Sequence, residues 1–486
     1  MKTKYKSIRN NIFSITFAQI LSLIFNIITF GIAARILSVS DFGLFNYNLA
    51  IIGFTAKIID LGINPIVFRE TSKNNAYDKY LGSALATKFL LIILLIVVIN
   101  TYAVFARLAT TTVVLLNLFA INIFFSNKYT NIRELLITPY KTTLRMSIPM
   151  ILILLDNVLL LLLTLSLNFF NNKLITFAFF YVIANLPSTI ILFWLLIKKE
   201  KIHFKFEAKL IKSLILTAFP IYGYVVLNII YKQLDVILLG SIKGADAVAI
   251  YSAAVRLSSP FVIFASAITM TFFPIIVKKL ENKENINNIV SSVIKILIAF
   301  SFTIAMLIVF NAKIILYLVF GEKYIYAELP LQLLITVMTF SFLNFFLVDL
   351  LTALNKQKYN FIYAAILLAI TTPLYFILLP KFSYNGAALT KLFAIFIGTI
   401  FLIYNTMKKV SLNINLIRFI LWIGSATLIF IFLSKLNFWI AIPLQVLTLI
   451  VLLFILQIFS YSELEIIFTS INKKHLLTKF ATLLKK

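Results

Sequence analysis

Runs of about 20 apolar residues recur along this chain of 486 residues, and they constrain its fold more than any other feature. A helix of that length crosses a hydrocarbon core of roughly 30 Å, whereas the strands of a membrane barrel alternate apolar and polar residues. The chain is 62% hydrophobic with a mean hydropathy of +1.02, well above soluble domains, which are about half apolar. The sequence therefore predicts an all-α polytopic membrane protein.

The apolar runs predict about 14 transmembrane helices joined by short loops, which leave no room for a catalytic domain outside the membrane. Residues 463–486 alternate apolar positions with lysines, which fits either an amphipathic helix at the membrane surface or a basic tail. The expected spans are 12–36, 42–68, 80–104, 108–126, 147–167, 174–197, 213–239, 247–277, 289–310, 329–353, 359–379, 385–407, 415–434 and 438–460.

Most lysines and arginines lie in alternate gaps between the spans. If the N-terminus is cytoplasmic, 30 of the 44 basic residues fall on the cytoplasmic side, Lys128 and Arg133 among them, and 7 on the opposite side. Cytoplasmic loops of membrane proteins carry such an excess of Lys and Arg. The bias predicts that both termini are cytoplasmic. It also explains the formal net charge of +27 without a nucleic-acid partner.

A short turn between two spans is repeated about 206 residues further along the chain, where residues 41–46 align with residues 247–252. One long period indicates two homologous halves, and six spans in each half would give both the same orientation. The predicted organisation is an N-terminal six-helix lobe (1–197), a cytoplasmic linker (198–212), a C-terminal six-helix lobe (213–407), two further transmembrane helices (408–462) and a basic amphipathic tail (463–486).

Seven basic and four acidic residues fall inside the predicted spans. Each costs about 2.5–3.5 kcal/mol at a helix centre, so each needs a reason, and the positive excess indicates a wet cavity that receives an anion. The candidate cavity cations are Arg35, Lys57, Lys88, Arg256, Lys295 and Lys391. Asp60, Lys232 and Asp235 are candidates for ion coupling or charge pairing.

Several of these charges also admit a structural explanation. Lys57 and Asp60 are three residues apart, as are Lys232 and Asp235, so each pair can share a helix face. Asp156 has no basic neighbour in the sequence, and its role stays open. Three cations lie close enough to a membrane surface to extend their charge into water: Arg35, Lys88 and Lys295.

Signatures of enzyme chemistry are absent from the sequence. The chain has no Cys, its two histidines lie in predicted cytoplasmic segments, and it contains no P-loop. We therefore expect no catalytic residue, no metal site and no cofactor. Energy for transport would come from an ion gradient, with H+ or Na+ as the candidate coupling ion, or from downhill movement of substrate. A buried carboxylate such as Asp60 or Asp235 could carry a proton.

Several stretches of the chain resemble one transporter family. Ala34-Arg35-Ile36-Leu37, Ser40-Asp41-Phe42-Gly43-Leu44-Phe45, Asp60-Leu61-Gly62-Ile63 and Arg69-Glu70 are similar to the first half of the Wzx-type O-antigen flippases. Three stretches resemble the second half of the same flippases: Asp235-Val236-Ile237-Leu238-Leu239-Gly240, Ile250-Tyr251-Ser252-Ala253-Ala254 and Phe273-Pro274. These flippases belong to the multidrug/oligosaccharidyl-lipid/polysaccharide exporter superfamily. The resemblance covers the first twelve predicted spans.

The resemblance implies two six-helix lobes around a central cavity, plus two C-terminal helices. It implies a transporter of the bacterial inner membrane that moves undecaprenyl-diphosphate-linked oligosaccharide outward by alternating access. Membrane lipids and polysaccharide polymerase machinery would be its other partners. Relatives that flip lipid-linked peptidoglycan precursor use cavity arginines, so Lys57 departs from that pattern. A multidrug antiporter of the same superfamily and a membrane-embedded glycan polymerase or ligase stay open as alternatives.

Overall fold

The computed structural model describes residues 2–74, 76–129, 131–412 and 415–459, so the predicted tail at 463–486 lies outside the described residues. The described residues form helices and no strand, which confirms the predicted all-α fold. The helices are α1 (Lys2–Ile36), α2 (Val39–Ile58), α3 (Ile63–Asn74), α4 (Tyr77–Phe105), α5 (Thr110–Asn122), η1 (Asn127–Tyr129), α6 (Ile132–Thr142), α7 (Ser147–Leu165), η2 (Ser166–Phe169), α8 (Lys173–Ile183), α9 (Leu186–Lys198), α10 (Ala208–Lys243), α11 (Ala245–Ser258), η3 (Ser259–Phe261), α12 (Val262–Glu281), α13 (Asn287–Phe320), η4 (Glu322–Ala327), α14 (Glu328–Ala353), α15 (Gln357–Met407), α16 (Leu416–Leu433) and α17 (Phe438–Ile455).

Within the described part of the chain, eight helices are long and apolar enough to cross a membrane. The bent pair α2 and α3, which meet at 47°, would make a ninth span. Shorter apolar helices include α5, α16 and α17. The protein is therefore a polytopic membrane protein, and the count of about 14 spans stays a prediction.

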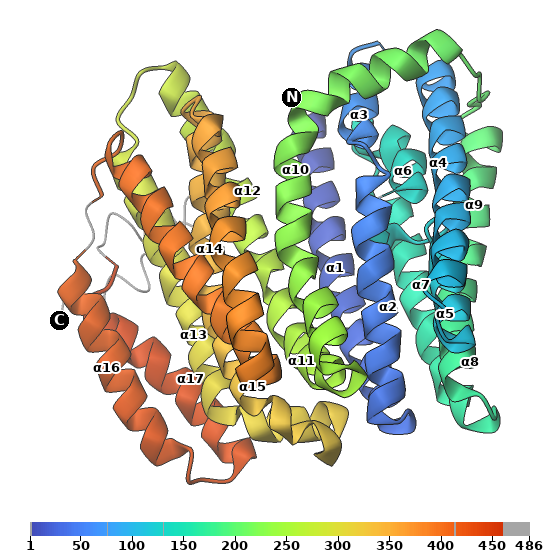
Figure 1. The fold of residues 1–486 in the computed structure, drawn as a ribbon. Coiled ribbons are helices and arrows are strands. Elements are labelled where there is room, and N and C mark those ends of the chain that lie inside the picture. The colour runs from blue at the N-terminus through green and yellow to red at the C-terminus, as the bar shows by residue number, and fades with distance from the viewer. Residues whose placement is uncertain (1, 75, 130, 413–414, 460–486) are drawn as a thin grey trace. The chain divides into compact units, whose positions relative to one another are not determined.

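The chain divides into two compact units (Figure 1). Unit 1 comprises Met1–Ser252 and Val319–Lys323, and unit 2 comprises Ala253–Leu318 and Tyr324–Lys486. The predicted lobe boundaries at residues 197 and 213 stay predictions.

In unit 1, the first copy of the repeated turn lies against the residues that precede the second copy. A Cβ atom on Gly43 of α2 would lie 1.8 Å from the carbonyl oxygen of Ala245, the first residue of α11. A Cβ atom on Gly240 of α10 would lie 2.2 Å from the ring of Tyr47. Because any side chain would collide at these two positions, glycine permits the close packing of α2 against the α10–α11 corner.

The connection between α9 and α10 is an ordered strap on unit 1. The backbone N–H groups of His203 and Lys205 donate to the side chain and carbonyl oxygen of Asp78, at 3.1 and 3.0 Å. The N–H of Glu207 donates to Ser83 at 3.0 Å. These three hydrogen bonds hold residues 203–207 against the first turns of α4.

A salt bridge fixes the other end of this strap. Arg145, in the connection between α6 and α7, donates to Glu200 at 2.6 Å, and this hydrogen bond raises the pKa of the arginine above its usual value. Phe204 stacks on Phe193 of α9 with ring centroids 5.2 Å apart. The segment predicted as a linker between halves is thus attached to unit 1 along most of its length.

In unit 2, α14 packs against α15 and α12. Helix α15 consists of two helical arms that meet at a kink, because Ser383 adopts the non-helical angles φ 50° and ψ −132°. The two arms of α15 pack closely, since a Cβ atom on Gly398 would lie 2.6 Å from the ring of Tyr363. The break at Ser383 falls between the predicted spans 359–379 and 385–407.

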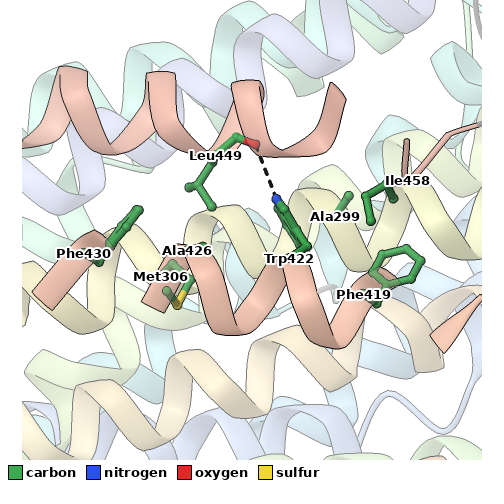
Figure 2. Close-up of a cluster of buried hydrophobic side chains, with 8 residues drawn as sticks. All are labelled: Ala299, Met306, Phe419, Trp422, Ala426, Phe430, Leu449 and Ile458. Carbon is green, nitrogen blue, oxygen red and sulfur yellow. Dashed lines mark hydrogen bonds between the residues drawn. The ribbon is translucent and has the colours of Figure 1, made fainter. Parts of the chain in front are cut away.

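Helices α16 and α17 form a hairpin that packs on α13 within unit 2 (Figure 2). Trp422 of α16 is fully buried at the centre of this contact, and its indole N–H points to the carbonyl oxygen of Leu449 at 3.4 Å. Asn311 of α13 donates to the buried side chain of Gln445 of α17 at 2.9 Å. Aromatic packing and one buried polar contact therefore hold the hairpin in place.

Candidate functional site

The predicted cation Lys88 lies in an ion pair in unit 1. Its ammonium contacts the carboxylate of Asp60, which lies in the bend between α2 and α3. Lys88 is fully buried, whereas the side chain of Asp60 is 16% exposed. Leu61 and Gly62 follow with positive φ angles of 51° and 69°, so the chain turns sharply at the charge. The pair is neutral, and losing one partner would leave a buried charge.

The other predicted residues of unit 1 occupy different environments. Arg35 is exposed at the end of α1, and its Nε donates to the carbonyl oxygen of Val319 at 3.3 Å. Lys57 is half-buried on α2, and Lys232 is exposed on α10. Asp235, three residues beyond Lys232, is buried and accepts a hydrogen bond from the hydroxyl of Tyr251 at 2.7 Å.

Three predicted cations lie in unit 2. Arg256 is on the last turn of α11, Lys295 is on α13, and Lys391 is on the second arm of α15. All three are half-buried. They come from three different helices, so they are not consecutive positions on one helix face.

A polar layer crosses unit 1 at about half the length of its helices. Helix α5 has 13 residues and α8 has 11, so each is about 16–20 Å long, which is too short to cross a core of roughly 30 Å alone. Helix α6 begins after the break that follows α5, and α9 begins after the break that follows α8. Figure 1 shows α3, α6 and α9 toward one end of the unit, and α5 and α8 toward the other.

An ion pair lies in this layer. Arg133, on the first turn of α6, is fully buried and pairs with Asp156 of α7. The second carboxylate oxygen of Asp156 accepts a hydrogen bond from Ser188, on the first turn of α9. A helix N-terminus carries partial positive charge, so two half-helices and an arginine stabilise this carboxylate. Arg133 also donates to the carbonyl oxygen of Phe125 at 3.3 Å.

Asparagine side chains pair with the backbone and with one another where the helices break. Asn64 of α3 donates to the carbonyl oxygen of Asn131 at 3.3 Å, and Asn131 donates to the carbonyl oxygen of Ala56 at 3.1 Å. Asn185 donates to Asn122 at 3.2 Å. Irregular backbone at membrane depth needs such partners because hydrocarbon supplies no hydrogen bonds.

Sequence reasoning did not find this layer. It assigned Arg133 to a loop in water and left Asp156 without a partner, whereas the two form one buried pair. The signal that could have found it is the density of asparagines from 122 to 131, with Asn185-Leu186-Pro187 in a later span. Both features are typical of broken helices.

Two family models match the chain. One is described as "Polysaccharide biosynthesis protein" and matches residues 8–280, and the second, MatE, matches residues 220–378. No curated protein matches the chain significantly.

Solved structures share the fold. One is titled "Lipid II flippase MurJ, inward closed conformation", with a TM-score of 0.73, 18% identity, and coverage of 94% of this chain and 98% of that one. A second is an inward-facing multidrug resistance MATE family transporter of the MOP superfamily, with a TM-score of 0.60, 14% identity, and coverage of 82% and 99%. A third is a MOP superfamily transporter from Pyrococcus furiosus, with a TM-score of 0.57, 13% identity, and coverage of 82% and 95%.

The chain is a polytopic membrane protein that shares its fold with the lipid II flippase and with transporters of the MOP superfamily. More specifically, the chain belongs to the polysaccharide biosynthesis protein family, whose model matches more than half of its residues.

Proposed function

We propose that this protein flips undecaprenyl-diphosphate-linked oligosaccharide repeat units from the cytoplasmic to the outer face of the bacterial inner membrane, as a Wzx-type flippase. The match of residues 8–280 to the polysaccharide biosynthesis family carries the proposal. The fold shared with a lipid II flippase supports it, because both tasks move a glycan on a lipid carrier. Both termini would be cytoplasmic, as the bias of basic residues predicts.

In this proposal, half-buried cations attract the diphosphate of the carrier lipid during alternating access. Lys57, Arg256 and Lys391 are the main candidates because each is partly accessible. Arg35 and Lys295 would contribute near the two membrane surfaces. Lys88 differs from these accessible cations, because Asp60 already neutralises its charge and its side chain is fully buried.

A gradient of H+ or Na+ would drive the transport. Asp235 is the candidate carboxylate for coupling, because it is buried and held by Tyr251. Asp60 is the other candidate, and its pairing with Lys88 would have to break for it to take up a proton. Lys232 is exposed on the same helix as Asp235 and stays a candidate for charge pairing. The polysaccharide polymerase machinery would receive the flipped unit.

The test replaces the candidate cations in a host that lacks the chromosomal gene. Arg256→Ala and Lys57→Ala should each reduce surface polysaccharide strongly while the amount of protein in the membrane stays constant. Arg256→Lys should restore part of the function, because it keeps the charge without the planar guanidinium. The matched control is Lys381→Ala, which removes an exposed cation near the break in α15. Normal polysaccharide in both alanine variants would overturn the charged-site mechanism.

A second candidate function is export of small molecules by antiport. The match of residues 220–378 to the MatE model favours it. An exporter predicts that deletion of the gene leaves surface polysaccharide intact and increases sensitivity to small cationic compounds. A glycan polymerase or ligase instead predicts that single repeat units accumulate on the outer face.

A further inference from the structure

We propose that unit 1 contains a binding site for one monovalent inorganic anion, such as chloride, in the polar layer beside Lys128. The site is separate from the residues proposed to attract the carrier lipid, and it does not depend on the flippase proposal. It stands on a cavity, on the contacts of Lys128 and on the charge balance around Asp156.

A cavity of about 40 Å³ lies where α5, α6, α8 and α9 break. One water needs roughly 10–15 Å³ of such space, so the cavity holds about three waters, or one small ion with a water. A sugar or a diphosphate does not fit. The cavity is lined by Asn127, Lys128, Ile153, Asp156, Asn157, Leu160, Ala184 and Asn185.

Lys128 brings a positive charge to this cavity. Its ammonium lies 4.5 Å from the centroid of the Tyr181 ring and 5.7 Å from that of Phe30, and Asp156 attracts it electrostatically. Among the described residues, no hydrogen bond or ion pair reaches this ammonium. Lys128 is exposed in unit 1, and the aromatic faces stabilise its charge only in part.

The carboxylate of Asp156, which lines the cavity, already has two partners. One oxygen of Asp156 pairs with Arg133 and the other accepts from Ser188. The pair of Arg133 and Asp156 sums to zero, so Lys128 leaves the site with a net charge of about +1. The N-terminus of α9 adds partial positive charge, because Asn185, which directly precedes that helix, lines the cavity.

The cavity also offers a hydrogen-bond donor for an anion. Asn157 gives one N–H of its amide to the carbonyl oxygen of Ile153 at 2.8 Å, and an amide nitrogen carries two. The second N–H and the ammonium of Lys128 can donate to one anion together. A small cation is disfavoured, because Lys128 repels it and both oxygens of Asp156 have donors.

The experiment measures the melting temperature of the purified protein in detergent against sodium chloride, sodium bromide and sodium gluconate at equal ionic strength. Chloride and bromide should raise Tm along a saturating curve, and gluconate, which is too large, should not. Lys128→Met should abolish the halide shift or weaken the apparent affinity by about tenfold or more. The control Lys201→Met, at an exposed position of the strap, should keep it.

Because Lys128→Met can also disturb folding, the wild-type protein supplies an independent readout. Crystals soaked in bromide should show an anomalous peak within contact distance of the Lys128 ammonium. Identical Tm curves in halide and gluconate would overturn the proposal, as would saturating bromide without a peak at this position. An unchanged halide shift in a folded Lys128→Met variant would do the same.

Discussion

The buried pair of Arg133 and Asp156 gives the sharpest stability prediction. Arg133 is fully buried and Asp156 is 7% exposed, so neither charge has bulk water as an alternative partner. Asp156→Leu leaves an uncompensated arginine between α6 and α7, and Arg133→Met leaves an uncompensated carboxylate. Breaking a buried pair in this way costs about 3–5 kcal/mol.

The double variant Arg133→Met with Asp156→Leu should be much more stable than either single variant. Replacing a whole buried pair by apolar side chains is often neutral, or stabilising by about 1–4 kcal/mol. Ser188 loses one acceptor in the double variant but keeps the carbonyl oxygen of Asn185 at 3.2 Å, so this loss adds little. The expected coupling between the two substitutions is therefore several kcal/mol, far above the roughly 0.5 kcal/mol at which distant sites deviate from additivity.

The assay is a double-mutant cycle on the protein in detergent, with Tm as a screen and the free energy of unfolding from a reversible method. The matched control cycle uses Arg145 and Glu200, whose salt bridge is exposed and should couple by about 1 kcal/mol or less. If the double variant loses the sum of the two single losses, the pair does not exist in the folded protein and the polar layer is wrongly described.

Three further substitutions test the packing. Gly82→Ala places a Cβ atom 2.3 Å from the carbonyl oxygen of Lys205, so the strap should detach and trypsin should cut it faster. The control Gly424→Ala meets nothing within 4 Å and should leave the cleavage rate unchanged. Equal cleavage rates in the two variants would contradict the docking of the strap on α4. Gln445→Leu should lower stability by about 0.6–2 kcal/mol through the lost contact with α13, and an unchanged Tm would count against that contact. Trp422→Ala should cost about 3–5 kcal/mol in thermal unfolding, and a loss below 1 kcal/mol would show that the hairpin is not anchored there.

The sequence was sufficient for the fold class, because membrane helices follow from length and hydropathy alone. It also indicated the importance of the repeated turn, whose first copy packs at Gly43 against Ala245, just before the second copy. Both features depend on local composition, which a single sequence contains.

The partners of buried charges could not be predicted in the same way. Spacing along the chain places Asp60 three residues from Lys57, and the structure shows that Asp60 also pairs with Lys88, which is 28 residues away. The polar segment around Arg133 predicts a loop, whereas the structure buries Arg133 at a helix break, where it pairs with Asp156. Packing between helices decides these contacts, and the spacing of residues along one helix gives no information about that packing.

The most direct test of the central claim is to delete the gene in its host and to determine on which face of the inner membrane lipid-linked repeat units accumulate. We predict loss of surface polysaccharide, with single undecaprenyl-diphosphate-linked units held on the cytoplasmic face and restored by the wild-type gene. Intact surface polymer, or units that accumulate on the outer face, would contradict the flippase proposal.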